Sequence, residues 1–502
     1  MKLGTVALLS TLGMALTSVS VWALTPEGGG PGAPVPAAAP AVTGPSSQGA
    51  RAGGGLLAGL VGDDGDASFT SGSTLMLEGR LGHAVLEAQR DNETFLMLNV
   101  SGATEDLASA SAPVNLSIVI DRSRSMEGRR LENALSAARG MVRRLRDGDT
   151  VSVVTYNTET SVVVPATVLD RRSRDDVLFA LRGIEARGHT CISCGVDAGL
   201  VAMGRRAGVS RMLLLSDGEA NTGIRDVGGF QLMAEQARGR DVSISTIGVD
   251  VDYNERVMFA LAQSSNGRHY FVSDEASLPR IFDAELDSLV RTVASRAEVE
   301  IDLAPGVTML EVLDRSFTRD GNRVLVPFGA FAQGENKTLL MRLRVPRGEV
   351  GDRPVAEVRM RYEDLTRNRP GSCEGSLIAR LSDDAAKVSP LDPIVEARVA
   401  RSETSAALVR ANELFSEGDI EAARRTLDSS RGRIRNRQSA AHTRASSADQ
   451  PAIDEDFARQ LSTLEEAEQG FGAAAAEPAP ASSRKGKAQV RSNAGVLDEL
   501  GL

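Results

Sequence analysis

The stretch that decides the fold is residues 114–128, which read VNLSIVIDRSRSMEG. Residues 114–120 are mostly apolar, which is typical of a short β-strand that is buried on both faces. The polar residues Asp121, Ser123 and Ser125 follow at alternate positions. Similar apolar runs then alternate with amphipathic stretches of helical length up to about residue 290. We therefore predict an α/β domain with a doubly wound, Rossmann-like and mostly parallel sheet.

The predicted α/β domain covers residues 113–292. Its expected strands lie at residues 114–120, 151–156, 211–215, 242–248 and 270–272. Its expected helices lie at residues 129–145, 174–181, 195–204, 230–238 and 255–263. These helices would cover both faces of the sheet, as continuously apolar strands require.

The stretches on either side of this domain have a different pattern. Residues 73–112 and 293–388 alternate apolar and polar residues, which predicts antiparallel strands with one buried face. We expect these strands to pair into one antiparallel β-sandwich into which the α/β domain is inserted; the alternative is a sandwich that only follows the domain. Residues 389–470 predict a helical region with a hairpin similar to one tetratricopeptide-type unit. Residues 471–502 predict a low-complexity or disordered tail.

The N-terminus indicates the compartment. Residues 1–23 have the organisation of a secretory signal peptide, with Lys2, an apolar stretch and the small residue Ala23 before the expected cleavage point. Residues 24–72 form a linker rich in Gly, Pro and Ala. We therefore expect an exported protein of the periplasm, the cell surface or the extracellular space. The alternative is an uncleaved anchor, because the apolar stretch is close to the length that spans a bilayer. No second stretch approaches that length, so no membrane span is expected in the mature chain.

The composition excludes several classes of function. The chain has 502 residues, a formal net charge of −10 and a pI of about 5.2, which argues against a nucleic-acid partner. Three Cys and four His leave few ligands for a zinc site. The motifs of P-loop nucleotide-binding proteins and of serine esterases do not occur.

Five oxygen-bearing side chains follow the predicted strands or precede a predicted helix. They are Asp121, Ser123, Ser125, Thr190 and Asp217. Ligands bind at the carboxyl edge of open α/β sheets, where the first and last of these residues are expected. Carboxylates and hydroxyls are hard ligands, so the set predicts a site for a divalent cation, Mg²⁺ in the first place and Mn²⁺ or Ca²⁺ as alternatives.

These five residues resemble the metal-ion-dependent adhesion site of von Willebrand factor A domains, and the resemblance covers about residues 113–290. It implies that Ser123, Ser125 and Thr190 coordinate the metal through hydroxyls, and that Asp121 and Asp217 act largely through bound waters. It also implies an open coordination position that is filled by an Asp or Glu of a protein partner. The family commonly has Gly between the two serines, where this chain has Arg124.

Several neighbours of this site have open roles. Arg124 and His189 are candidates for contact with an acidic ligand. Cys191 and Cys194 directly follow Thr190, and they are either a local disulfide, a redox pair or two thiols at a helix start. The segment 250–252 is expected to cap the helix after it, or to add negative potential near the metal.

The sequence therefore predicts an exported, metal-dependent adhesion or scaffolding protein and no enzyme. One alternative is a metal-assisted hydrolase with His189 as the nearby base. Another is an envelope sensor or assembly subunit with an internal acidic ligand, for which residues 454–456 and 465–466 are candidates. The exported layout also resembles bacterial secreted von Willebrand A proteins that are often labelled calcium-activated chloride channel homologues. A pore is not expected without membrane-spanning helices.

Overall fold

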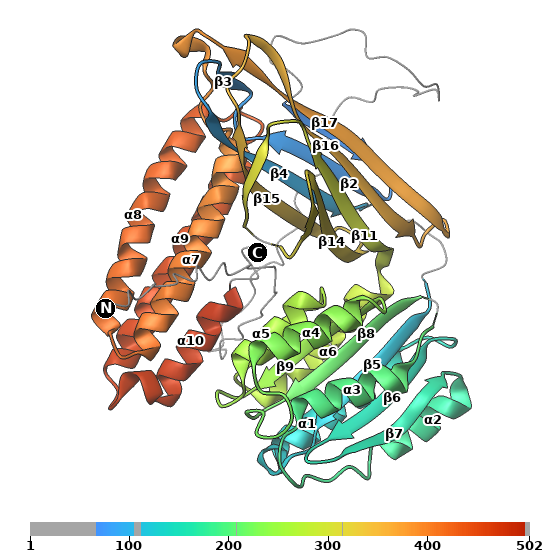
Figure 1. Ribbon diagram of the computed structural model, residues 1–502. Helices are drawn as coiled ribbons and strands as arrows, with labels where there is room; N and C mark the ends of the chain where they lie inside the picture. The colour runs from blue at the N-terminus through green and yellow to red at the C-terminus, as the bar shows by residue number, and fades with distance from the viewer. Residues whose placement is uncertain (1–66, 105–111, 207, 314, 497–502) are drawn as a thin grey trace, which may run out of the picture.

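The computed structural model describes residues 67–104, 112–206, 208–313 and 315–496 (Figure 1). They form three units: an inserted domain (residues 112–291), a β region (residues 67–104 and 292–382) and a helical unit (residues 393–496). The predicted signal peptide and most of the predicted linker lie outside the described residues.

The inserted domain contains a six-stranded sheet in the order β10-β9-β8-β5-β6-β7. Its strands are β5 (Val114–Asp121), β6 (Thr150–Tyr156), β7 (Thr160–Val168), β8 (Val209–Ser216), β9 (Val242–Val249) and β10 (His269–Val272). All neighbouring pairs are parallel except β6 and β7, which are antiparallel. Strand β7 was not among the expected strands. Its Pro165 and its largely exposed residues fit an edge strand, which lacks a clear apolar pattern.

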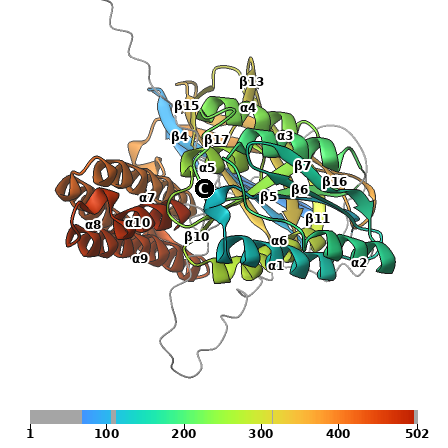
Figure 2. The same ribbon diagram turned by 90° about the horizontal axis from the view of Figure 1, so that it is seen from below.

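Helices cover both faces of this sheet, as the apolar strands require (Figure 2). One face packs against α1 (Arg129–Arg144), α2 (Arg171–Ala180) and α6 (Leu278–Val290). The other packs against α3 (Ile192–Met203), α4 (Val227–Arg238) and α5 (Glu255–Ser264). Two short 3-10 turns, η1 (Arg124–Met126) and η2 (Glu275–Ser277), precede α1 and α6. The predicted doubly wound α/β fold is therefore confirmed.

The β region consists of two sheets. The first has the order β1-β2-β4-β15-β12, with β1 (Ser68–Gly72), β2 (Leu75–Leu81), β4 (Asn92–Gly102), β12 (Thr308–Val312) and β15 (Asn336–Val345). The second has the order β13-β14-β11-β16-β17-β3, with β3 (Val85–Glu87), β11 (Thr292–Leu303), β13 (Thr318–Asp320), β14 (Arg323–Ala332), β16 (Gly351–Asp364) and β17 (Arg369–Ser382). Both sheets contribute to one hydrophobic core, and all pairs are antiparallel except β17 and β3.

The inserted domain interrupts the β region. Strand β4, before the domain, pairs along its length with β15, after it, and Leu98 lies opposite Leu339. The two ends of the insertion also meet at Gln333, whose side-chain amide donates to Thr104 O at 3.1 Å and whose backbone N–H donates to Arg291 O at 2.9 Å. The predicted pairing of strands from both sides of the α/β domain is therefore present.

The helical unit contains α7 (Pro393–Ser416), α8 (Ile420–Arg444), α9 (Gln450–Ala475), the 3-10 turn η4 (Pro480–Ser482) and α10 (Arg484–Val496). A further turn, η3 (Ala385–Lys387), precedes it. Its core includes the stacked rings of Phe415 and Phe471, whose centroids lie 4.3 Å apart. Val395 and Val399 of α7 pack against Met97 and Leu340 of the first sheet, so the helical unit packs on the β region.

Two predicted boundaries need correction. The linker was expected to extend to residue 72, but β1 begins at Ser68 and pairs with β2. The tail from residue 471 was expected to be of low complexity or disordered, but α9 continues to Ala475 and α10 follows. Neither segment has a strong apolar period, because β1 is an edge strand and α10 contacts its neighbours through many polar groups. No helix among the described residues is long and apolar enough to cross a membrane.

The insertion predicts that the β region folds without the inserted domain. Because Thr104 and Arg291 both bond to Gln333, a short Gly/Ser linker in place of residues 105–291 should close the gap. We expect a cooperative urea transition from this variant, and a circular dichroism spectrum with both β-strand and α-helix signals, because the variant keeps the helical unit. The full chain with the same linker replacing only residues 105–111 is the control. Loss of cooperative unfolding in the deletion variant alone would show that the β region depends on the inserted domain.

Candidate metal centre

The five predicted ligands converge at the carboxyl edge of the sheet in the inserted domain. Asp121 is the last residue of β5, and Asp217 directly follows β8, its parallel neighbour. Thr190 lies in the loop before α3. Asp121, Asp217, Ser123 and Thr190 are at most 3% exposed, and Ser125 is exposed. We call these five residues the candidate metal centre.

Asp121 links the two central strands. One carboxylate oxygen, Oδ1, accepts the backbone N–H of Ser123 at 2.8 Å, and Oδ2 accepts the hydroxyl of Ser216 at 2.8 Å. Ser216 is the last residue of β8, so this carboxylate holds the two strand ends together. The pKa of Asp121 is raised to about 7, mainly by burial away from water and to a smaller extent by the nearby Asp217 carboxylate, while the hydrogen bonds from Ser123 and Ser216 act to lower it.

Asp217 connects to the serine pair. The Ser125 hydroxyl donates to Asp217 Oδ1 at 2.7 Å, and the Ser123 and Ser125 hydroxyl oxygens lie 3.0 Å apart. Burial also raises the pKa of Asp217, against the hydrogen bond from Ser125 and the charge of Arg130. A bound cation would favour the ionised form of both buried carboxylates.

Thr190 is the fifth residue of the candidate metal centre, and its hydroxyl lies near Gly218. A Cβ added to Gly218 would lie 3.5 Å from both the Ser125 and the Thr190 hydroxyl oxygens, so these two oxygens face the same small space. Asn221 holds the backbone of Thr190 from both sides: its side-chain oxygen accepts the Thr190 N–H at 2.9 Å, and its N–H donates to Thr190 O at 3.1 Å. Among the described residues, no hydrogen-bond partner satisfies the Thr190 hydroxyl, so it is free to bind a ligand.

The chemistry of these donors fits a small, hard divalent cation. Hydroxyl and carboxylate oxygens suit Mg²⁺, Mn²⁺ or Ca²⁺ better than softer metals. Within the described part of the chain, no group of three or more His, Cys, Asp or Glu is placed to hold a metal ion. The hydroxyls of Ser123, Ser125 and Thr190 would therefore supply most of the direct ligands, and the two Asp would balance the charge.

The two cysteines after Thr190 form a disulfide, Cys191–Cys194, at the start of α3. The loop after β8 packs directly on it. A Cβ on Gly223 would lie only 2.7 Å from Cys191 Sγ and 2.4 Å from Ser193 Oγ, and Gly223 has a positive φ of 75°. Glycine is therefore required here on both counts. The disulfide thus braces the Thr190 loop against the loop that carries Asp217. Cys373 is a free, buried thiol in the β region, and burial raises its pKa to about 11.

Arg124 and His189, the two candidates for contact with an acidic ligand, lie on loops that hydrogen bonds connect. The Arg124 N–H donates to Gly188 O at 3.2 Å, and the His189 N–H donates to Thr158 Oγ1 at 3.0 Å. Both residues are exposed, so their side chains face solvent beside the centre. Within the described chain, no hydrogen bond joins the His189 ring to a residue of the centre.

Arg130 was not among the residues predicted from the sequence, and it connects Asp250 with the centre. Arg130 Nη1 donates to Asp217 Oδ2 at 2.8 Å and to Ser125 O at 3.1 Å, while Nη2 donates to Asp250. Arg130 lies in the first turn of α1, where the helix dipole disfavours a cation, and this was the signal that a carboxylate partner exists. The segment 250–252 was expected to cap the next helix or to add negative potential near the metal. Asn254 caps α5 instead, by accepting the Val257 N–H at 3.3 Å, and Asp250 lies near the centre through Arg130.

The internal acidic candidates stay within the helical unit. Asp456 accepts a hydrogen bond from Arg401 Nε at 2.6 Å, and Asp454 contacts His442 Nδ1 at 2.8 Å. The side chains of Glu465 and Glu466 bond to Gln469 and Ser462 of the same helix, α9. The structure therefore does not bring any of these carboxylates to the metal centre.

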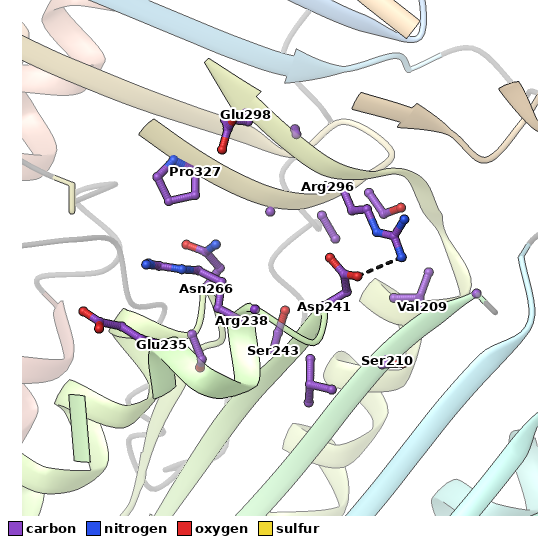
Figure 3. Close-up of a pocket in the computed structure, with 18 residues that line it drawn as sticks. Val209, Ser210, Glu235, Arg238, Asp241, Ser243, Asn266, Arg296, Glu298 and Pro327 are labelled. Atoms are coloured by element: carbon purple, nitrogen blue, oxygen red, sulfur yellow. Dashed lines mark ion pairs between the residues drawn. The ribbon is translucent and has the colours of Figure 1, made fainter. Parts of the chain in front are cut away.

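A pocket of about 350 Å³ lies between the inserted domain and the β region, far from this centre (Figure 3). It is lined by Val209 and Val242, which begin β8 and β9, so it lies at the opposite edge of the sheet from Asp121. Across it, Arg296 pairs with Asp241 at 2.8 Å, and both side chains are about half exposed. This pocket is an open junction between the two units, with both charged and apolar residues in its lining.

Comparison with known sequences agrees with this geometry. The sequence profile of the von Willebrand factor type A domain matches residues 115–284, which begin in β5 and end in α6. The chain carries a von Willebrand factor type A (VWA) domain. Two curated relatives are the uncharacterized protein YfbK of Escherichia coli (strain K12), 26% identical over 267 residues, and the uncharacterized protein sll0103 of Synechocystis, 25% identical over 264 residues. Each match covers 50% of this chain, and 45% and 62% of the relative. The chain thus spans about half the length of these relatives.

Solved structures extend the likeness beyond the VWA domain. A von Willebrand factor type A protein from Catenulispora acidiphila has a TM-score of 0.66 and 17% identity, over 86% of this chain and 99% of its own. The ArnB paralog VWA2 from Sulfolobus acidocaldarius has a TM-score of 0.56 and 17% identity, over 86% of this chain and 100% of its own. At this identity the likeness concerns the fold alone.

The disulfide generates a stability prediction. A disulfide that closes so short a loop restricts the unfolded chain, and it thereby raises the free energy of the unfolded state by about 2 kcal/mol. We expect the double variant Cys191→Ser, Cys194→Ser to lower the free energy of unfolding of the VWA domain by about this amount, measured by urea denaturation. Wild-type protein in reductant should match it, whereas Cys373→Ser should keep the sensitivity to reductant. Equal stability of the double variant and the oxidised wild type would contradict a bracing role.

Proposed function

We propose that the protein is an exported, metal-dependent protein-binding module, whose VWA domain binds an acidic residue of a partner through a divalent cation. VWA domains are in general interaction modules. The observation that carries the proposal is the convergence of the Ser125 and Thr190 hydroxyls on Gly218, beside Asp217. The export rests on the sequence of residues 1–23 alone.

In this proposal, some residues of the metal centre coordinate the cation and others balance its charge. When bound, a cation held mainly by neutral hydroxyls offers a strongly electrophilic position to an incoming carboxylate. Ser123, Ser125 and Thr190 would be these neutral ligands. Asp121 and Asp217 would balance the charge of the cation, largely through bound waters. Arg124 and His189, on the exposed rim, would meet the residues of the partner that flank its Asp or Glu.

Cation binding can be tested by calorimetry. We expect Mg²⁺ or Mn²⁺ to bind the wild type with about one equivalent, as in a single VWA site. The variant Gly218→Val should lose this binding, because its side chain would fill the space that the Ser125 and Thr190 hydroxyls face. Thr167→Ala is the control, since within the described part of the chain its hydroxyl bonds only to Pro165 O on β7. No cation binding in a folded wild type would refute the metal-dependent function.

Carboxylate recognition can be tested with peptides. We expect immobilised peptides that contain one Asp or Glu to bind the full chain in Mg²⁺, and to lose binding in chelator. The isosteric Asn and Gln peptides are the controls, because an amide carries no charge to balance the cation. Binding that is equal for Asp and Asn peptides, measured by surface plasmon resonance, would argue that the partner is recognised without the metal.

A further inference from the structure

Helix α10 has one face that contacts the VWA domain and another that contacts the rest of the helical unit. Arg484, Lys487, Ala488 and Arg491 recur at intervals of three and four residues, so they lie on one face of the helix. Ala488 packs against the core of the VWA domain on this face, while Val490 packs against the core of the helical unit. The helix therefore lies between the two units, as Figure 1 shows.

The face toward the VWA domain is basic, and it meets an acidic segment between β9 and α5. Arg491 donates to the backbone oxygens of Val251 at 2.9 Å and Tyr253 at 3.1 Å, and it pairs with Glu255. Its guanidinium also lies over the Tyr253 ring, 4.8 Å from the centroid. Lys487 pairs with Asp252 at 2.9 Å. These contacts hold α10 to the carboxyl edge of the sheet, which is the edge that carries the metal centre.

The opposite face is held by the helical unit. Asn493 donates to Asn412 Oδ1 at 2.9 Å, and Asn412 donates to Val490 O at 3.2 Å. A Cβ on Gly486 would approach Phe415 to 3.0 Å, so the helix lies close against α7 at this point. Movement of the helical unit would therefore displace α10 relative to the VWA domain.

A chain of ion pairs runs from α10 into the metal centre. Arg484 pairs with Asp250 at 2.9 Å. Arg130 pairs with the same Asp250 carboxylate and, at 2.8 Å, with Asp217. The Arg130 guanidinium thus contacts two carboxylates, Asp250 and Asp217 of the metal centre. Arg484 competes with Arg130 for the Asp250 carboxylate. Asp250 and Asp217 are nearly buried, with side chains 8% and 0% exposed, so water screens these contacts little.

We propose that α10 is a bridge through which the helical unit lowers the cation affinity of the metal centre, with Asp250 and Arg130 as positioning residues. The proposal rests on the proposed function. While α10 is docked, Arg484 partly neutralises the charge of Asp250. The attraction between Asp250 and Arg130 is then weaker, so Arg130 pairs more strongly with Asp217. When α10 leaves, Arg130 turns to Asp250, and the cation no longer competes with the Arg130 guanidinium for the Asp217 carboxylate. A partner that moves the helical unit would then tighten the hold of the VWA domain on metal and ligand.

The first test is a double-mutant cycle on the full chain, read by calorimetric titration of Mg²⁺. We expect Arg484→Ala to tighten binding about two- to fivefold, a modest effect because the Arg484 side chain is 68% exposed. Arg130→Ala should tighten it about tenfold, because it frees a buried carboxylate. In the Arg130→Ala background, Arg484→Ala should have little further effect.

Lys485→Ala is the matched control for this cycle. Lys485 is also on α10 and equally exposed, but it pairs with Glu477 of the helical unit. If Lys485→Ala tightens binding as much as Arg484→Ala, or if the effects of Arg484→Ala and Arg130→Ala simply add, only net charge is at work and the bridge is refuted.

The second test needs no metal. Coupling between two sites is reciprocal, so Arg130→Ala should leave Asp250 to Arg484 and dock α10 more tightly. We expect hydrogen exchange of the α10 amides in metal-free protein to slow about two- to fivefold in Arg130→Ala, and to quicken in Arg484→Ala. Unchanged exchange in Arg130→Ala would overturn the bridge even if the centre binds cations. Absence of cation binding in the wild type would instead refute the proposed function, and the exchange data would still decide whether α10 and Arg130 are coupled.

Discussion

The constraint on which the structure depends is the complete burial of β5. This strand lies between β6 and β8 and is covered by helices on both faces, so its last residue, Asp121, is 0% exposed. A buried carboxylate must be hydrogen-bonded, since its desolvation is otherwise costly. The partners are the Ser123 N–H, in the loop that follows, and the Ser216 hydroxyl at the end of β8. The same carboxylate thus folds the serine loop back and aligns the two strand ends beneath the metal centre.

The second carboxylate of the centre is satisfied in a different way. Asp217 has a hydroxyl on one oxygen and the Arg130 guanidinium on the other, and Arg130 leads on to Asp250 and α10. The first carboxylate is therefore fixed by the sheet, whereas the second shares the Arg130 guanidinium with Asp250, which also pairs with Arg484 of α10. This asymmetry is the reason why the C-terminal helix can influence a site that the VWA domain builds by itself.

The chain sequence explains some of these features through local pattern. The apolar run 114–120 and its equivalents predict the parallel strands because a strand buried on both faces must be apolar throughout. The alternating strands around the insertion were recognised for the same kind of reason. Strand β7 and helix α10 were missed, since one is a half-exposed edge and the other contacts the VWA domain through Arg and Lys rather than through an apolar stripe.

By itself, the sequence determined the α/β class of the central domain, the five residues of the candidate metal centre and the presence of β strands on both sides. These depend on periods of two or about four residues and on polar residues directly after apolar runs, all of which are local. Only the tertiary structure decided that β4 closes against β15, that Arg130 shares Asp217 with Asp250, and that Arg484 of α10 reaches the same carboxylate. Such contacts join residues far apart in the chain, and a charged side chain can pair with any exposed opposite charge until folding brings one of them close.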